Sequence, residues 1–456
     1  MDKKLDLDFI CRTLRLPMPP RNRPVGRIVT DSRQAAAGDV FFALRGGHFD
    51  GHDFAAEVAA KGALPVVSRE DCTGLPGALR VDDTLSALQA LAAAWRDAVN
   101  PFVLGITGSA GKTTVKEMLA HILRHCFGGE AVLATAGNFN NHIGLPLTLL
   151  SLRPQHRYAV IEMGMNHFGE LALLTRLAKP DAALANNALR AHIGCGFDGV
   201  ADIARAKSEI YQGVKPGGLA LLPRDDANFA VFQAACEGLR TRTFGVDLGD
   251  ICAQNISLQP LFSRFDLTAG DETAAVALPV PGRHNVHNAV AAAALAWAAG
   301  LPLAEVARGL EGFENIRGRL QILRGMKNAE IIDDTYNANP DSMKAALDVL
   351  ASQPAPRVFV MGDMGELGGA QTDALHAEIG AYAAAQGIES AYFVGDASAQ
   401  AAESFGGRGL WFADKDPLIQ VLRHELPEKA SILVKGSRFM RMEEVVAALR
   451  GADDLE

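Results

Sequence analysis

Gly105-Ile106-Thr107-Gly108-Ser109-Ala110-Gly111-Lys112-Thr113-Thr114 is the stretch that decides the fold of this 456-residue chain. It follows an apolar run at 102–104 and precedes apolar residues at helical spacing over 115–123, so it predicts a strand, a glycine loop and a helix. In such loops backbone N–H groups and the helix N-terminus surround phosphate oxygens, Lys112 reaches the outer phosphates, and Thr113 ligates magnesium. The stretch therefore predicts a nucleoside triphosphate site.

The loop departs from the strict phosphate-binding pattern at one position. Ile106 stands where the first glycine is usual, and the glycine lies one residue earlier, at Gly105. The alternative is a glycine-rich turn that ends in Lys-Thr by coincidence. The strand and helix on either side favour the phosphate site.

Composition limits the possible classes of protein. The length and the 48% hydrophobic content predict two or three domains. The net charge of -9 argues against a nucleic-acid binder, which would need a basic face. The six cysteines form no CxxC pair, and no apolar run approaches the ~18 residues of a membrane span. We therefore expect a cytoplasmic protein without membrane insertion.

The order of strand and helix patterns predicts an α/β fold with three domains. A small α/β unit at 1–99, with a helix at 84–99, ends before Asn100-Pro101. The nucleotide-binding unit at 100–315 includes a parallel sheet, with a strand at 182–185, helices at 201–211 and 289–299, and a β-rich stretch to about residue 280. Strands and helices then alternate over 316–456, which predicts a Rossmann-like third domain that ends in a helix at 443–449.

Several polar residues follow predicted strands of the central unit. Glu162 ends the apolar strand 158–161, where a magnesium ligand is expected, although an exposed strand terminus is the alternative. His192 follows the strand 182–185, and a lone histidine is more often structural. The glycines at 194–199 match a dinucleotide pattern, but no strand directly precedes them, so we interpret the match as coincidental.

Other polar clusters have two open interpretations. Residues 281–288 open the helix 289–299, and their Asn285 and Asn288 either cap it or contact adenine and ribose. The clusters at 30–33 and 46–53 are either ordinary turns or parts of a site. In the third domain, the loops after strands are polar, and such loops bind ligands in open α/β sheets.

Taken together, these motifs resemble the Mur ligases of bacterial peptidoglycan synthesis, and the resemblance covers all three domains. The motifs that resemble the central ATPase of that family are the Gly-Lys-Thr-Thr loop, Glu162-Met163-Gly164, Ala191-His192, Ala206-Lys207-Ser208-Glu209 and His284-Asn285-x-x-Asn288. The motifs that resemble the member adding D-alanyl-D-alanine to UDP-muramoyl tripeptide are Asp334 to Pro340, Met361 to Gly368 and Lys435 to Arg438. The Asp-Asn-Pro-Arg motif of the relative that adds the third amino acid is missing.

The resemblance implies an ATP-dependent amide ligase that uses Mg²⁺ and forms an acyl phosphate, and we expect a monomer. Its substrates would be UDP-muramoyl tripeptide, held at its uridine end by the N-terminal domain, and D-alanyl-D-alanine. The implied catalytic residues are Lys112, Lys207, His192, Arg319 and Asn141. The implied ATP-binding residues are Gly108, Ser109, Ala110, Gly111, Lys112, Thr113, Thr114, Asn285, Asn288, Arg319 and Asp334. The implied metal ligands are Thr113, Glu162, His192 and a carbamylated Lys207, and the implied substrate residues are Asp31, Ser32, Arg33, Asn138, Asn141, Asn337, Asn339, Ser342 and Lys435.

Two alternatives stay open at this stage. The chain could be a sibling Mur ligase that uses another amino acid, or a P-loop nucleotide switch that is no ligase. The absence of an Asn-Lys-x-Asp guanine motif and the polar loops of the third domain disfavour the switch. Whether the third residue of the acceptor peptide is diaminopimelate or lysine stays open.

Overall fold

The computed structural model describes residues 4–47 and 49–450. The chain divides into two compact units. The first contains Met1–Ile106, Leu123–Ala183 and Glu209–Leu219, and the second contains Thr107–Ile122, Leu184–Ser208 and Ala220–Glu456.

The N-terminal part is a small parallel sheet with the order β1-β2-β3-β4. Its elements are α1 (Leu7–Leu14), β1 (Ile28–Val29), β2 (Val40–Phe42), η1 (Gly51–Phe54), α2 (Ala55–Ala60), β3 (Leu64–Val67), η2 (Glu70–Cys72), β4 (Leu79–Arg80) and α3 (Thr84–Val99). Helix α3 begins where the Asp83 side chain accepts the Ser86 N–H, and it ends at Asn100, which has a left-handed conformation just before Pro101.

The central part is a nine-stranded sheet with the order β13-β12-β11-β10-β9-β8-β5-β7-β6. Its first elements are β5 (Phe102–Thr107), α4 (Lys112–Phe127), η3 (Gly129–Ala131), β6 (Val132–Ala134), α5 (Gly144–Leu150), β7 (Tyr158–Glu162), α6 (Glu170–Ala178), β8 (Ala182–Ala185), α7 (Val200–Ser208) and η4 (Glu209–Gly213). The remaining ones are β9 (Leu219–Pro223), α8 (Phe229–Ala234), β10 (Arg240–Gly245), β11 (Ile251–Leu258), β12 (Ser263–Ala269), β13 (Glu272–Leu278), α9 (Arg283–Ala298) and α10 (Leu303–Glu311). Strands β7 and β8 are buried along their whole length, as expected of a parallel sheet covered on both faces, whereas the antiparallel strand β12 alternates between buried and more exposed residues.

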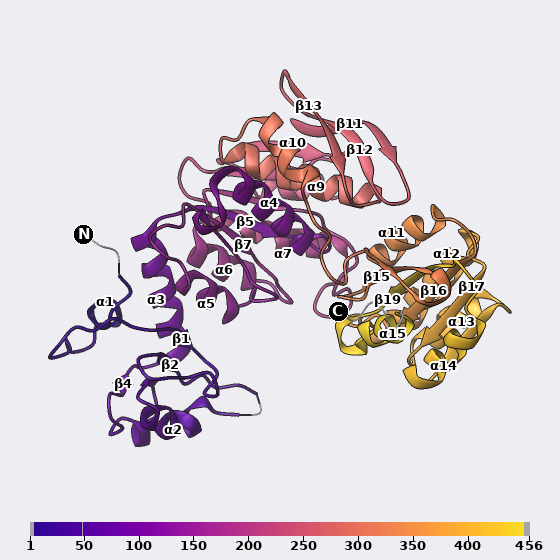
Figure 1. Cartoon of the computed structure of the whole chain (residues 1–456). Coiled ribbons are helices and arrows are strands. Elements are labelled where there is room, and N and C mark those ends of the chain that lie inside the picture. The colour runs from indigo at the N-terminus through magenta and orange to yellow at the C-terminus, as the bar shows by residue number, and fades with distance from the viewer. Residues whose placement is uncertain (1–3, 48, 451–456) are drawn as a thin grey trace. The chain divides into compact units, whose positions relative to one another are not determined.

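The C-terminal part is a sheet with the order β14-β15-β19-β16-β17-β18, in which β14 is antiparallel to its neighbour and the other pairs are parallel. Its elements are β14 (Gln321–Arg324), η5 (Met326–Asn328), β15 (Glu330–Asp334), α11 (Pro340–Ala351), β16 (Arg357–Gly362), α12 (Gly369–Ala385), β17 (Ser390–Val394), α13 (Ser398–Phe405), β18 (Gly409–Phe412), α14 (Lys415–Glu425), β19 (Ser431–Lys435), η6 (Arg438–Met440) and α15 (Glu443–Leu449). Two hydrophobic cores flank this sheet, one formed with α11, α12 and α13 and the other with α14 and α15. Figure 1 labels these helices around the strands of the sheet. Helices on both faces of a mostly parallel sheet confirm the predicted Rossmann-like fold.

Most predicted elements of regular structure are confirmed, and three predictions need correction. The predicted helix 289–299 begins at Arg283, because Gly282, with φ of 94°, ends the preceding loop there. The predicted helix 201–211 is α-helical only to Ser208 and continues as a 3₁₀ turn. The predicted β-rich stretch also contains the short helix α8, since six residues are too few for a clear helical period.

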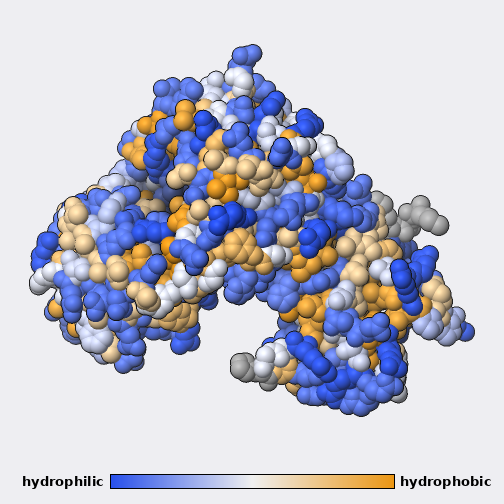
Figure 2. All heavy atoms as spheres, turned by 180° about the vertical axis from the view of Figure 1, so that it is seen from behind, coloured by the Kyte–Doolittle hydropathy of each residue, from blue (hydrophilic) through white to orange (hydrophobic). Residues whose placement is uncertain are grey.

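The surface carries charged and polar residues with hydrophobic groups between them (Figure 2). Among residues 4–47 and 49–450, no helix has both the length and the apolar character that crossing a membrane requires. Within the same residues Cys195 is the exposed cysteine, whereas Cys126 is partly buried and the other four thiols are buried.

Candidate active site

The phosphate loop has the predicted strand-loop-helix form. Strand β5 ends at Thr107 and helix α4 begins at Lys112, so the glycine loop lies directly at the helix N-terminus. Gly111 has a φ of 79°, and a Cβ at this position would overlap the side chains of Asn288 and Asn186. Only glycine fits there.

Two asparagines hold the tip of the loop. The Asn187 Oδ1 accepts the Ala110 N–H at 2.9 Å, and the Asn186 Nδ2 donates to the Ala110 carbonyl at 3.0 Å. The Ser109 hydroxyl pairs with the backbone of Leu189. Since these groups already bond to protein, bound phosphates would mainly meet the N–H groups of the first turn of α4, which have no intrahelical partners.

Asn285 and Asn288 support this loop from helix α9. Both side chains are buried. The Asn288 Oδ1 accepts from Asn186 Nδ2 at 3.0 Å, and the Asn285 Nδ2 donates to the Pro281 carbonyl at 2.8 Å. Neither asparagine caps α9, because the helix begins at Arg283 and both residues lie inside it. Their contact with the nucleotide stays a prediction.

Arg319 reaches the phosphate loop from the beginning of the third domain. Its Nη2 donates to the Thr113 Oγ1 at 2.9 Å, and its guanidinium lies 4.2 Å from the ring centre of Tyr336. The Arg319 Nε is buried without a described hydrogen-bond partner. The cation–π contact with Tyr336 therefore orients the guanidinium, and its Nε–H can donate a further hydrogen bond.

Asp334 and Lys435 form a largely buried ion pair that contacts Leu320, the residue after Arg319. The Lys435 side chain is 3% exposed, and its Nζ lies 2.5 Å from Asp334 Oδ2 and 2.9 Å from the Asn337 carbonyl. The Asp334 Oδ1 accepts the N–H of Leu320, which has a left-handed φ of 53°. The pair thus fixes the turn that presents Arg319. The ammonium of Lys435, which is predicted as a substrate residue, contacts Asp334 and Asn337 of the protein.

A polar pocket lies between the phosphate loop and the loops of the third domain. It is lined by Ser109, Lys112, Ala191, His192, Asn337, Ala338, Asn339, Gly365, Glu366 and Leu367. His192 and Glu366 both have left-handed backbones, with φ of 64° and 60°, and the His192 Nδ1 lies 3.5 Å from the Glu366 Oε2. Such strain is typical of functional sites. The structure therefore brings together five of the predicted residues, from segments that lie far apart in the sequence: Ser109, Lys112, His192, Asn337 and Asn339.

Three predicted substrate residues also organise the start of helix α11. The Asn339 Oδ1 accepts the Ser342 N–H at 2.9 Å, and the Ser342 Oγ accepts the Asn339 N–H at 3.0 Å, which is a reciprocal capping box. The Asn337 Oδ1 accepts the Ala338 N–H at 2.9 Å. Asn337 and Asn339 line the pocket, and Ser342 supports Asn339 from the first turn of α11.

Lys207 lies in helix α7 and is 2% exposed. Burial, together with the Lys112 cation, lowers the pKa of Lys207 well below its ordinary value. A neutral amine is the form that reacts with carbon dioxide, so this environment suits the carbamylation that the resemblance implies.

Glu162 is the last residue of β7 and is 3% exposed, so the alternative of an exposed strand terminus is wrong. Its Oε1 accepts from Asn140 Nδ2 at 2.8 Å, and its Oε2 is buried without a described hydrogen-bond partner. An unsatisfied buried carboxylate oxygen fits a magnesium ligand. Among the described residues no group of three or more His, Cys, Asp or Glu side chains could hold a metal by itself.

The predicted residues Asn138 and Asn141 lie in the loop before α5, and both are exposed. The Asn141 Oδ1 accepts the N–H groups of Ile143 and Gly144 at 3.1 and 2.8 Å. This bonding shapes the loop that carries Asn138 and leaves that side chain at the surface.

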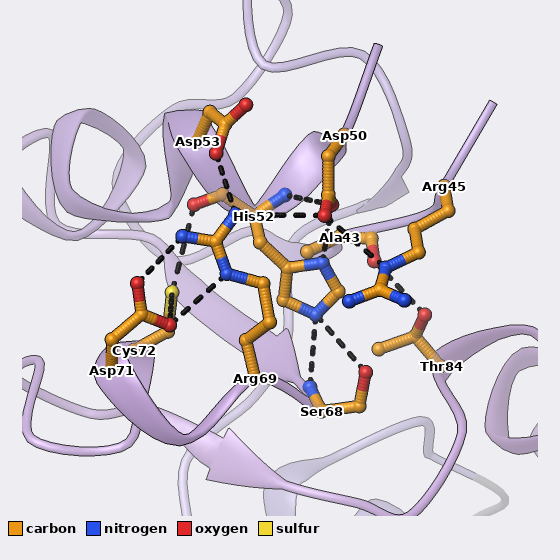
Figure 3. A network of polar contacts seen from close by, with 10 residues as sticks. All are labelled: Ala43, Arg45, Asp50, His52, Asp53, Ser68, Arg69, Asp71, Cys72 and Thr84. Carbon is orange, nitrogen blue, oxygen red and sulfur yellow. Dashed lines mark hydrogen bonds and ion pairs between the residues drawn. The ribbon is translucent and has the colours of Figure 1, made fainter. Parts of the chain in front are cut away.

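A buried histidine organises the loop 49–53 of the N-terminal part (Figure 3). The His52 Nε2 accepts the Ser68 N–H at 2.9 Å, so its Nδ1 carries the proton and donates to Asp50 Oδ1 at 2.6 Å. Burial opposes ionisation of Asp50, but hydrogen bonds from His52 outweigh it and lower the pKa of Asp50 to about 2. The Ser68 hydroxyl also lies 3.2 Å from the same Nε2, so both polar groups of Ser68 meet the His52 ring and the network stiffens the loop.

The predicted residues Asp31, Ser32 and Arg33 lie in a turn at the surface, where Asp31 and Ser32 are partly buried and Arg33 is exposed. Arg33 Nη2 donates to Asp31 Oδ2 at 2.7 Å, and this bond lowers the pKa of Asp31 to about 2. The Arg33 side chain is 87% exposed, and the Ser32 carbonyl accepts from Lys61 at 3.1 Å. The guanidinium is thus open to an anionic ligand.

Sequence reasoning missed four residues that contact predicted ones, namely Asn140, Asn186, Tyr336 and Glu366. Tyr336 and Glu366 lie in motifs quoted above, Asn140 precedes the predicted Asn141, and Asn186 directly follows the predicted strand 182–185. Closeness in the sequence was the only signal for them. Several polar residues are neighbours in each of these stretches, and tertiary contacts decide which of them faces a partner.

Models of three protein families match the chain. The model for the Mur ligase family catalytic domain matches residues 24–96, that for the Mur ligase middle domain matches 106–296, and that for the Mur ligase glutamate ligase domain matches 318–438. Together they cover most of the sequence.

Relatives and solved structures agree with these models. The UDP-N-acetylmuramoyl-tripeptide–D-alanyl-D-alanine ligase of Escherichia coli K12 is 43% identical over 93% of this chain and 93% of its own, and that of Haemophilus influenzae is 40% identical over 94% of both. A crystal structure of MurF from Acinetobacter baumannii has a TM-score of 0.88 at 37% identity and covers 96% of this chain and 97% of its own. MurF from Thermotoga maritima in complex with ADP has a TM-score of 0.82 at 26% identity and covers 92% of this chain and 96% of its own. With the phosphate loop and the polar pocket, these matches establish that the chain belongs to the Mur ligase family.

Proposed function

We propose that this protein joins D-alanyl-D-alanine to UDP-N-acetylmuramoyl-tripeptide with the conversion of ATP to ADP and phosphate. The observation that carries the proposal is the match, over more than nine-tenths of the chain, to ligases named for this reaction. The pocket supports it, because the phosphate-binding Lys112 and the loops of the third domain line the same space.

The reaction transfers the γ-phosphoryl group of ATP to the carboxylate of the tripeptide. The amine of the dipeptide then attacks the acyl carbon, the C–N bond forms, and the C–O bond to phosphate breaks. Lys112, the first-turn amides of α4 and Arg319 would hold the phosphates and balance their charge. Positioning and charge stabilisation therefore supply most of the rate.

Magnesium, when bound, neutralises charge on the phosphate and acyl oxygens. Thr113 and Glu162 would hold it through oxygen atoms, and by resemblance His192 and a carbamylated Lys207 would contribute. Carbamylation would turn the Lys207 cation into a carboxylate, which removes the repulsion between this buried amine and a divalent ion.

The remaining predicted roles belong to the same proposal. Asp31, Ser32 and Arg33 would bind the nucleotide end of the acceptor, and Asn138 and Asn141 would lie near the reacting groups. The further roles proposed are Asp334 at the ribose, Asn285 and Asn288 at the nucleotide, and Asn337, Asn339, Ser342 and Lys435 near the peptide or dipeptide. We place the domains at 1–99, 100–315 and 316–456 and the protein in the cytoplasm as a monomer.

Phosphate release tests the function directly. Purified protein with ATP and Mg²⁺ is mixed with UDP-muramoyl tripeptide, with and without D-alanyl-D-alanine, and free amino acids replace the dipeptide in parallel. We expect sustained phosphate release only with both substrates present, together with a product heavier by one dipeptide residue.

Two results would contradict the proposal. Equal stimulation by a free amino acid would identify a sibling ligase with another amine substrate. Phosphate release at the same rate with and without the tripeptide would identify a simple nucleotide hydrolase or switch.

A further inference from the structure

Glu366 faces the pocket from the third domain, and none of the roles above uses it. It lines the pocket together with Lys112 and His192. Its carboxylate lies 3.5 Å from His192 Nδ1, and its side chain is 58% exposed, so its oxygens can accept further hydrogen bonds. The position is therefore suited to a ligand that carries donors.

The loop that carries Glu366 is fixed by its neighbours. Glu366 has a φ of 60°, which a residue with a side chain rarely adopts. The Met364 N–H donates to the buried His376 Nε2 at 2.9 Å, and the Gly365 N–H donates to Ser437 Oγ at 2.7 Å. Because hydrogen bonds immediately before the residue hold this backbone, the direction in which the Glu366 side chain leaves the loop is set before any ligand arrives.

Charge indicates which ligand fits. Among the described residues that line the pocket, Glu366 is the sole carboxylate, while Lys112 provides a cation. A free dipeptide carries an ammonium at pH 7, since an α-amino group has a pKa of about 7.7–8.0. An ammonium near the lysine of a phosphate loop needs an anion beside it.

We propose that Glu366 binds the ammonium of the incoming D-alanyl-D-alanine and is thereby a specificity-determining residue for the amine substrate, an inference that rests on the proposed function. The carboxylate accepts hydrogen bonds from the ammonium and holds the nitrogen at the pocket that Lys112 also lines. His192 shares the carboxylate and limits its rotation.

The test compares Glu366→Gln with the wild-type enzyme. Glutamine keeps the size and removes the charge, so the KM for D-alanyl-D-alanine should rise about ten- to hundredfold while the KM for ATP stays within twofold. Glu366→Asp restores the charge and should recover part of the increase. Glu403→Gln, an exposed glutamate on α13, is the matched control and should leave both constants unchanged.

Trapping with hydroxylamine separates this role from the earlier step. Hydroxylamine is uncharged at pH 7 and captures an acyl phosphate without an ammonium. In Glu366→Gln we expect hydroxamate formation from ATP and tripeptide at the wild-type rate, while amide formation with the dipeptide falls. A wild-type enzyme that forms no hydroxamate and no amide would defeat the proposed function itself.

Three outcomes would overturn the role of Glu366 alone. One is an unchanged KM for the dipeptide in Glu366→Gln. Another is an equal fall of hydroxamate and amide formation, which would assign the residue to phosphoryl transfer. The third is a raised Mg²⁺ requirement with an unchanged dipeptide KM, which would make Glu366 a metal ligand.

Discussion

His376 shows how one buried side chain ties the stability of the pocket to pH. It is fully buried, its Nε2 accepts the Met364 N–H at 2.9 Å, and its Nδ1 donates to the Thr372 carbonyl at 2.7 Å. Burial lowers the pKa of His376, because the charged form would lose its solvation and the Met364 bond. The native ring is therefore neutral.

Acid should consequently destabilise the protein through this residue. Below the unfolded-state pKa of about 6.5 the unfolded chain binds a proton that native His376 does not, so stability falls with decreasing pH by up to about 1.4 kcal/mol per unit. His376→Gln can keep the acceptor without the titration. Melting temperatures from pH 7 to pH 5 should fall less steeply in the variant, and parallel curves would contradict the assignment.

The ion pair between Lys435 and Asp334 leads to a prediction about the free energy of unfolding. Lys435→Met should lower the free energy of unfolding by about 3–5 kcal/mol, because it leaves the Asp334 carboxylate, 15% exposed, without its cation. The double variant Lys435→Met with Asp334→Asn should lose less. Denaturant unfolding measures both, and additive losses in the double variant would show that the two side chains are not coupled.

The variant Lys207→Ala tests whether activity depends on a carbamylated Lys207. Lys207→Ala should lose activity by at least about a hundredfold, because the site then lacks a carboxylate close to the metal. Added acetate or formate should restore part of the rate by filling the space with a carboxylate. Full activity in the variant, without any effect of these acids, would exclude the modification.

Among the elements, the segment 189–197 is tied to the third domain. Arg190 donates to Asp341 in α11 and to Glu378 in α12, at distances of 2.6–3.1 Å. The Gly368 N–H donates to the Ile193 carbonyl at 2.8 Å, and a Cβ added to Gly368 would lie 2.5 Å from the Cα of Gly194. The segment that carries His192 therefore rests on the loop that carries Glu366.

Gly368→Ala should separate these two segments. Gly368 has a φ of -68°, which alanine adopts freely, so its effect would come only from the collision with Gly194. We expect kcat to fall about tenfold or more, since a misplacement of about 1 Å costs up to a hundredfold. Gly369→Ala, where an added Cβ meets open space, is the control and should keep full activity. Equal activity of the two variants would contradict a functional contact.

The sequence predicted the elements better than their contacts. Buried apolar runs such as 182–185 and helices such as 84–99 carry a clear local pattern, and the phosphate loop carries its own chemistry. The start of α9 was missed because histidine and asparagine are weak helix formers. The partners of Arg190 lie 151 and 188 residues away, and no local pattern encodes such a pairing.

For the whole molecule, nucleotide should stabilise the fold through magnesium. A nonhydrolysable ATP analogue with Mg²⁺, at about 100 times its Kd, should add about 2.7 kcal/mol and raise the melting temperature. Removing the metal with EDTA should shrink this shift, and Lys112→Ala should abolish it, since Lys112 lies at the start of the phosphate loop helix. If the melting temperature still rises with EDTA present and in Lys112→Ala, the nucleotide binds at a site other than the phosphate loop.

Cys195 has a practical consequence for chemical biology. Its thiol is exposed, and its N–H bonds to the His192 carbonyl at 3.0 Å, so an electrophile can react next to a residue that lines the pocket. A fluorophore attached there would report the arrival of substrates by a change in emission. An inhibitor scaffold with a mild warhead could use the same sulfur as an anchor and gain residence time that reversible competitors lack.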